Sequence, residues 1–278
     1  MAKMKIQISK DDFEQSILAA TSSHSEVFES VEPHFKESYL RLSQQILGEV
    51  GEAALETSDD LREAVIKAVC LDAFLGVVRH LDLVLTPTGF GVVANNEVTP
   101  ASSSRVEALI EQCRIALIVA QDTVMSHLTV VSGWGSTLQA QQGIQTVVWS
   151  MGGYCYLTRQ TSMTSKDWMS KLAAMQEADA TLRKLVSDEQ MDDIMCLVRG
   201  VREGNEFEGC VRLMLSRSLI MLANDMLSAY SNERARLLRY FDAHLDNFPI
   251  YADSSAYKAN HFKEFNNEKS KPAFVFNA

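Results

Sequence analysis

Apolar residues recur at steps of three and four along most of the chain, which is typical of amphipathic helices. The most regular run is Val211, Leu215, Leu219, Leu222, Met226 and Tyr230, and a further stripe restarts at Ser231 or Asn232 and ends at Phe248. Similar spacing predicts helices from Asp11, from Val31 to Ile46, from Thr57 to His80, from Ser104 to about Val131, from Thr164 and from Ser187. The pattern predicts a mainly α protein, a multi-helix bundle of two helical halves.

One segment, residues 81–102, interrupts this pattern with short apolar runs. Pro87, Pro100 and the glycines between them exclude a continuous helix, so we expect an irregular apolar loop. Hydrophobic loops of this length are uncommon and serve either as packed elements or as surfaces for a partner. The residues expected to contact a partner here are Leu85, Pro87, Phe90, Val92 and Val93.

The same segment contains Gly89 to Ala94, which matches the pattern G-x-G-x-x-A of dinucleotide-binding folds. That motif requires a helix that starts within the glycines, yet Asn95, Asn96 and Pro100 follow at once. We therefore expect the glycines to allow tight packing instead of binding a cofactor.

Residues 132–164 differ in character, because they combine five glycines with Trp134 and Trp149. Two stretches, 146–151 and 154–158, flank Gly152 and Gly153 with the spacing of a two-residue turn, which predicts a small β-hairpin. Trp149 and Tyr154 are candidate anchors for a ligand or a neighbouring subunit. The alternative is a packed crossover between the two helical halves.

Both ends of the chain are expected to form extended arms. Residues 3–9 alternate apolar and polar positions, which predicts a short strand that docks on a neighbouring subunit. Residues 250–278 are mostly polar and close with Phe274, Val275 and Phe276, which are expected either to add to the sheet of another chain or to fray. The expected organisation is a first half at 1–131, a crossover at 132–164, a second half at 165–249 and an arm at 250–278.

The charge and the cysteine content limit the classes of function that the chain can have. The chain has 26 basic and 36 acidic residues, which gives a net charge of −10. This charge argues against general nucleic-acid binding, because such binding depends on basic residues that contact phosphates. An acidic surface repels DNA and therefore suits a wall along which DNA slides as cargo. Five separated cysteines without a CxxC pair indicate free thiols. No apolar run is long enough for a membrane span, so we expect a protein made in the cytoplasm of its host, with no membrane partner.

No sequence motif indicates a catalytic reaction or a metal site. The six histidines are scattered without an HExxH pattern, and neighbouring acids such as Asp59 and Asp60 point to different sides of a helix. Walker, nucleophile-elbow and Cys/His patterns are missing from the sequence. We expect no catalytic residue, no metal and no cofactor.

The stretch from Leu81 to Ser102, with Arg105, Val106 and Glu107 after it, resembles a signature of uncharacterised virion-assembly proteins of tailed phages and prophages of gut Bacteroidales. The chain is similar more loosely at 164–168, at 188–191 and at 248–251. Because the genes of these proteins neighbour capsid and tail genes, the resemblance implies a structural virion protein at the neck. The implied role is a head-to-tail connector subunit that forms a homo-oligomeric ring at the portal vertex and contacts portal or tail proteins.

Two other hypotheses stay open. A helical assembly chaperone that acts before the particle matures would share the acidic charge and the amphipathic helices. An enzyme would require a deep pocket with ionisable groups near residues 149–156.

Overall fold

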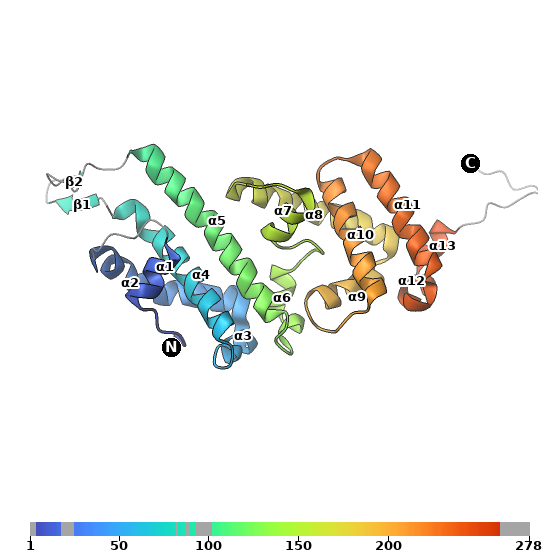
Figure 1. Cartoon of the computed structure of the whole chain (residues 1–278), viewed down its shortest axis with the longest axis horizontal. Coiled ribbons are helices and arrows are strands. Elements are labelled where there is room, and N and C mark those ends of the chain that lie inside the picture. The colour runs from blue at the N-terminus through green and yellow to red at the C-terminus, as the bar shows by residue number, and fades with distance from the viewer. Residues whose placement is uncertain (1–3, 18–24, 82, 87–88, 93–101, 262–278) are drawn as a thin grey trace, which may run out of the picture.

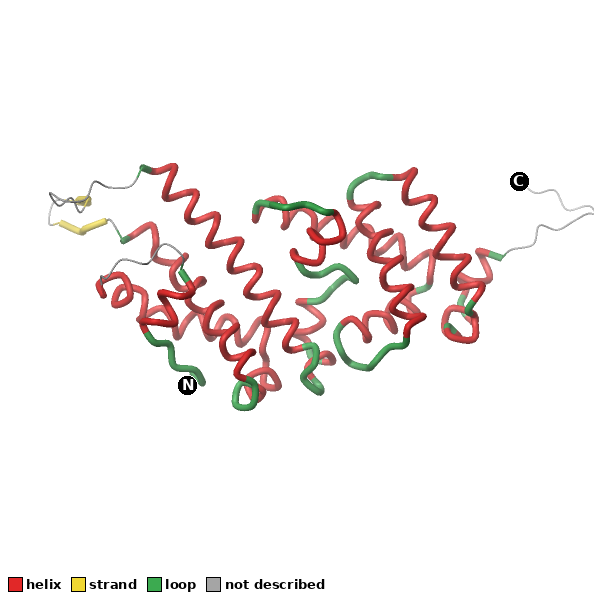
Figure 2. Tube along the Cα trace, in the orientation of Figure 1, coloured by secondary structure: helices red, strands yellow, loops and turns green. Residues whose placement is uncertain are grey.

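The computed structural model describes residues 4–17, 25–81, 83–86, 89–92 and 102–261. These residues form an elongated, mainly α structure, which confirms the predicted multi-helix fold (Figure 1). Helices at one end come from the first half of the chain, and those at the other end come from the second half. A short stretch of helices and loops lies between them (Figures 1 and 2).

The first half is built around two long helices, α4 (Asp59–Val77) and α5 (Ser103–Leu128), which pack along each other. The other elements of this half are α1 (Lys10–Ser16), α2 (Ser25–Leu42), the π-helical turn η1 (Ser43–Leu47), α3 (Gly48–Ala54), the 3₁₀ turn η2 (Val78–His80) and the strands β1 (Leu83–Thr86) and β2 (Gly89–Val92). Helix α2 starts six residues before the predicted Val31, so Pro33 lies inside the helix.

The middle of the molecule contains η3 (Trp134–Ser136), α6 (Leu138–Gly143) and α7 (Met151–Thr158). The second half follows with α8 (Ser165–Val186), α9 (Asp188–Val198), α10 (Glu206–Ala223), α11 (Leu227–Ala243), η4 (Leu245–Asn247), α12 (Pro249–Asp253) and α13 (Ser255–Asn260). Helices α10 and α11 form a helical hairpin, because the chain turns at residues 224–226, where Asp225 has a φ of 55°.

Side-chain caps explain where several helices begin. Ser58, Thr164 and Ser187 each accept a hydrogen bond from a backbone N–H in the first turn of α4, α8 and α9, at or next to the starts that the sequence predicts. Helix α5 is an exception, because Ser102 holds the cap position and its side chain accepts no such bond. Asn205 and Glu208 form a capping box at the start of α10.

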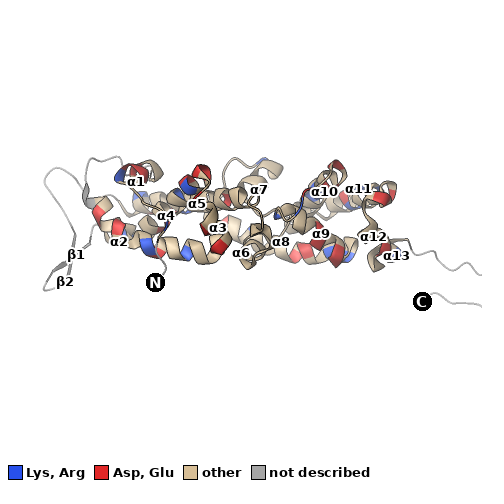
Figure 3. Cartoon of the chain, turned by 90° about the horizontal axis from the view of Figure 1, so that it is seen from below, with Lys and Arg blue, Asp and Glu red and all other residues tan. Residues whose placement is uncertain are grey.

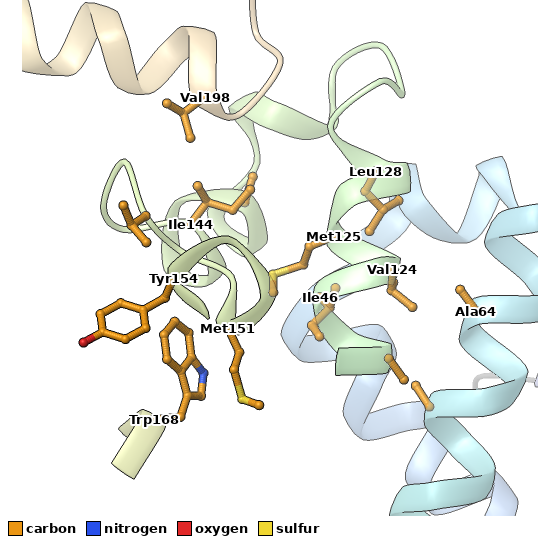
Figure 4. Packing of buried hydrophobic residues seen from close by; sticks show 14 of the residues in the cluster. Ile46, Ala64, Val124, Met125, Leu128, Ile144, Met151, Tyr154, Trp168 and Val198 are labelled. Atoms are coloured by element: carbon orange, nitrogen blue, oxygen red, sulfur yellow. The ribbon is translucent and has the colours of Figure 1, made fainter. Parts of the chain in front are cut away.

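A single cluster of buried side chains runs through both halves and the middle of the molecule. Figure 4 shows its central part, where Ile144, Met151 and Tyr154 lie to one side of α5, with Val198 of α9 near Ile144 and Trp168 of α8 near Tyr154. The middle segment therefore acts as packing between the halves.

The predicted hairpin at 146–158 is wrong, because residues 151–158 form α7 and residues 146–150 lead into it without a strand. Ser150 accepts a hydrogen bond from Gly153 N, and Asp122 of α5 accepts one from Met151 N at 2.8 Å. These two caps stabilise the start of α7. The β-branched and aromatic residues of the stretch favour a strand, which is why the sequence pattern predicted one.

The predicted arms need correction where the structure describes them. Residues 4–9 form no strand, and Ile6 is buried in the core of its own chain. Residues 250–261 fold onto the second half as α12 and α13, with Tyr251 fully buried. The backbone N–H of Tyr251 donates to Gln190 at 3.1 Å, and Asn260 donates to the Leu185 carbonyl at 3.0 Å. Phe274, Val275 and Phe276 lie outside the described residues.

Candidate interaction surfaces

The apolar segment expected to be an irregular loop contains a regular β-hairpin. Strands β1 and β2 pair antiparallel, with Leu83 opposite Val92 and Leu85 opposite Phe90. Successive residues of a strand alternate between its faces. The register therefore places Leu83, Leu85, Phe90 and Val92 on one face of the ribbon and Val84, Thr86, Gly89 and Gly91 on the other. One face is composed of large apolar residues only.

This hairpin projects from the end of the helical body. Both views show it beyond the helices at the end of the molecule opposite to α11–α13 (Figures 1 and 3). The two strands contact chiefly each other. A two-stranded hairpin is marginally stable in water unless a further strand or a helix packs against it. Its geometry therefore suits a segment that another surface completes.

A second surface lies in the middle of the molecule, at the other end of α5. A groove of about 600 Å³ lies here. Its walls are the end of α5 with the loop after it, Trp149, and the chain from the end of α9 to α10. A smaller hollow of about 210 Å³ follows along α7 and α10, and Trp149 and Arg212 line both. We call these two hollows the Trp149 groove.

Uncharged residues, some of them apolar and exposed, form one side of the Trp149 groove, from the end of α5 to α7. Residues 123–158 contain no Asp, Glu, Lys or Arg, and α6 and α7 accordingly carry neither charge colour in Figure 3. Val130 on one wall is 85% exposed, and Tyr156 of α7 is 84% exposed. Val201, on the facing wall, is also exposed. Depletion of charge together with exposed apolar and aromatic residues is typical of the centre of protein interfaces.

Arg212 gives the Trp149 groove a positive charge. Neighbouring Arg202 is neutralised, since it pairs with Asp193 and Glu208 at 2.6 Å each. Within the part of the chain that the structure describes, Arg212 forms neither an ion pair nor a side-chain hydrogen bond, and the carboxylate of Glu203 on the same groove does not pair with it. Burial among protein atoms lowers the pKa of Arg212, although the guanidinium stays charged at neutral pH. The cation is thus available to an acidic partner.

Two close backbone approaches hold the walls of the Trp149 groove in place. Gly200 has a φ of 74°, and a Cβ at this position would lie 1.7 Å from the Thr129 carbonyl oxygen. A Cβ on Gly135 would lie 2.4 Å from the Arg199 carbonyl oxygen. Only glycine allows either contact. Because Arg199 also donates to the Ile144 carbonyl at 2.9 Å, the end of α9 is fixed to both α5 and the middle segment.

Two carboxylates of α5 position the helices that follow it. Glu111 accepts hydrogen bonds from Ser165 N at 2.6 Å and Ser165 Oγ at 2.9 Å, at the start of α8. Asp122, about three turns further along, accepts the Met151 N–H at the start of α7. Burial raises the pKa of Asp122 to about 7, against the opposing effect of this hydrogen bond. Helix α5 thus connects the hairpin end of the molecule to the Trp149 groove.

The candidate residues from the sequence fall into three groups. Leu85, Phe90 and Val92 lie on the apolar face of the hairpin, while Pro87, Val93 and residues 274–276 lie outside the described residues. Trp149 lies on the groove. Tyr154 was expected at an interface but is 0% exposed, because it packs edge-to-face on Trp168 and its hydroxyl hydrogen-bonds Asn224.

Sequence patterns missed three features of the groove. Tyr156 and Val130 look like core residues by composition, and Arg212 looks like a solvated position on an amphipathic helix. No local signal marks them, since the groove is formed by segments far apart in the chain. The absence of charged residues between positions 123 and 158 is the one sequence feature that indicates where the groove lies.

The remaining chemical candidates give no organised centre in the described residues. The stretch that matches G-x-G-x-x-A forms β2 over Gly89–Val92, whereas the dinucleotide motif requires a turn into a helix. The described ranges hold no group of three or more His, Cys, Asp or Glu side chains placed to bind a metal ion. Among the described helices, none is long and apolar enough to cross a membrane.

Comparison with protein families gives one match. Residues 32–137, less than half of the chain, are similar to a family of unknown function (DUF6712). The matched range includes the hairpin, α5 and the α5 wall of the Trp149 groove. No curated protein and no solved structure matches the chain.

Proposed function

We propose that this chain is a structural virion protein of a tailed phage, a head-to-tail connector subunit that assembles with itself as a ring at the portal vertex. The resemblance of residues 81–102 to virion-assembly proteins supports a role in the virion. The observation that carries the proposal is the projecting hairpin, whose face of Leu83, Leu85, Phe90 and Val92 lies beyond the helical body of its own chain.

The hairpin is suited to assembly for two physical reasons. Apolar area of the hairpin that a neighbour covers would contribute about 25 cal/mol per Å² of surface removed from water. The outer edges of its two strands also offer backbone N–H and C=O groups to a further strand, which is a common way for chains to join. A ring of such subunits would keep each hairpin covered.

The charge of the chain fits a wall beside DNA. Acidic residues are exposed from α3 to the start of α4, at Glu49, Glu56, Asp59, Asp60 and Glu63, of which Glu56 pairs with Lys5 and Asp59 with Arg62. Like charge repels the phosphate backbone, so a surface of this kind lets DNA pass without holding it. In the proposed ring this acidic edge faces the channel, DNA is cargo only, and portal and tail proteins are the other partners.

Mass spectrometry of purified mature particles tests the proposal. A connector is expected in the particles at a constant ratio to the portal protein, and negative-stain images of isolated necks are expected to contain it. A chain found in infected cells but missing from mature particles would contradict the connector role and favour the alternative, an assembly chaperone.

A further inference from the structure

The lining of the Trp149 groove is partly polar and partly apolar. Thr129 and Ser132 contribute hydroxyl groups, whereas Trp149 and Val201 contribute apolar surface. Arg212 adds a cation that forms no ion pair within the described part of the chain. A protein segment that matches this lining therefore presents a carboxylate next to a small number of apolar side chains.

The turn between α10 and α11, residues 225–228, has this composition. Met226 is 50% exposed and Leu227 is 65% exposed, and they are the only consecutive pair among the exposed large apolar residues that the structure describes. Asp225 directly precedes them and is exposed as well. Its carboxylate forms neither an ion pair nor a hydrogen bond with any described residue. A free carboxylate and two apolar side chains are thus exposed together at one turn.

Hydrogen bonds hold the α10–α11 turn in a fixed shape. Asp225 has a φ of 55°, and the N–H of Met226 donates back to a carbonyl of α10 at 2.8 Å. The side chain of Asn224 donates to Tyr154 of α7 at 3.1 Å and accepts from Lys171 of α8 at 2.7 Å. A segment that already has its bound shape loses little conformational entropy when it docks. The turn is therefore suited to insert into a preformed groove.

The α10–α11 turn cannot reach the groove of its own chain. Arg212 lies in the second turn of α10, whereas the α10–α11 turn follows the last residue of that helix, Ala223. Eleven helical residues span about 17 Å at 1.5 Å per residue. Figure 1 shows the turn at the end of α10 opposite to the loop that leads into this helix from α9. Any contact between the turn and the groove is therefore intermolecular.

We propose that the α10–α11 turn of one copy docks in the Trp149 groove of a second copy. In this contact Asp225 pairs with Arg212, and Met226 and Leu227 pack against Trp149. The contact joins two different surfaces, so it is head-to-tail, and repeated head-to-tail contacts close into a ring when the rotation allows. This inference rests on the proposed ring assembly and adds a second contact to that of the hairpin.

Neutral substitutions test the ion pair in the full chain by sedimentation equilibrium. Asp225→Asn and Arg212→Gln each remove one charge, and Asn tolerates the positive φ at position 225. Each is expected to weaken self-association about fivefold or more, and the double variant is expected to associate as weakly as the single variants, because all three lose the same pair. Asp246→Asn and Arg217→Gln are the matched controls, since both residues are exposed and lie outside the turn and the groove lining.

The two controls are expected to leave self-association unchanged. Equal effects of a variant and its control would overturn the proposed contact, as would additive losses in the double variant. A chain that stays monomeric at all concentrations would overturn it too.

A methionine pair tests the apolar part of the contact. Met226→Ser removes an apolar side chain from the turn, and Met169→Ser makes the same change on α8, where Met169 is 61% exposed. Met226→Ser is expected to weaken self-association about threefold or more, and Met169→Ser is expected to leave it unchanged. Equal losses for the two variants would contradict packing of the turn on a second copy.

Photo-cross-linking locates the contact itself. A benzophenone amino acid replaces Leu227, and isotopically labelled and unlabelled copies are mixed so that cross-links between copies are recognised by mass. The expected cross-links join position 227 to residues 126–132, 147–157 or 197–216 of another copy. Cross-links to other parts of the chain, or to another virion protein in assembled particles, would overturn the groove assignment and leave the connector role standing. Absence of the chain from mature particles would remove the connector role whatever the cross-links show.

Discussion

Among single residues, Gly200 has the strongest steric requirement. Its φ of 74° disfavours any other residue, and the Thr129 carbonyl lies where a Cβ would be placed. Gly200→Ala is expected to lower the free energy of unfolding by about 2–4 kcal/mol, measured by urea denaturation. Gly209→Ala on α10 is the control, because no atom lies within 4 Å of the added Cβ. Gly209→Ala is expected to be neutral or to stabilise by up to about 1 kcal/mol. Equal losses for the two variants would refute this view of the groove wall.

Asp122 predicts a pH dependence of stability. Its pKa is raised in the folded chain to about 7 from an ordinary value near 3.8, so the folded state binds the proton more tightly than the unfolded state. The free energy of unfolding is therefore expected to fall as the pH rises from about 4 to about 7, by on the order of 1–4 kcal/mol from this group. Asp122→Asn keeps an acceptor for Met151 N–H but cannot titrate.

Urea denaturation of both proteins between pH 4 and pH 8 checks this prediction. The difference between Asp122→Asn and the unchanged chain should grow in favour of the variant up to about pH 7 and then level off. Parallel curves over this range would show that the Asp122 carboxyl titrates alike in the folded and unfolded states.

Among the elements, the π-helical turn η1 is held by the middle segment. Trp134 is fully buried, and its indole N–H donates to the Ile46 carbonyl of η1 at 2.9 Å. Gln139 donates to the Gln44 carbonyl of the same turn. Trp134→Phe removes the donor and with it the hydrogen bond to the Ile46 carbonyl, so it is expected to cost about 0.5–1.5 kcal/mol of stability beyond the loss of ring volume.

Trp168→Phe is the matched control for that prediction. Trp168 is also buried, yet its indole N–H forms no hydrogen bond with a described residue. Chemical denaturation of both variants should therefore show the greater loss for Trp134→Phe. An equal loss would mean that the bond to η1 adds nothing to stability.

The elements also show how far the sequence could predict this structure. Helix starts with a local cap, such as Ser58 and Thr164, were predictable because cap and amide lie within one turn. Helix α7 was missed although Ser150 caps it locally, because two glycines and β-branched residues surround that cap. Its second cap, Asp122, lies 29 residues away in the sequence. The hairpin was placed in the wrong segment, because β-branched residues at 146–148 resembled strands and Pro87 was taken only as a helix breaker.

For the molecule as a whole, two surfaces lie at opposite ends of α5. The sequence indicated the hairpin segment as a contact surface, whereas the Trp149 groove forms only through the fold. The candidate residues Leu85, Phe90, Val92 and Trp149 lie on them, but Arg212, Tyr156 and Val130 come together only through the fold. The carboxylates Glu111 and Asp122 connect α5 to the helices on its far side. A rigid α5 therefore sets the distance between the hairpin and the groove, and with it the geometry that a ring would need.

A cryo-EM map of the portal vertex of the mature particle is the decisive measurement. The proposed assembly predicts a ring of this chain in which each hairpin, residues 83–92, lies on a neighbouring copy and the acidic edge at the start of α4 faces the channel. A vertex without this chain, or a ring in which the hairpin packs on its own helices, would contradict the proposal.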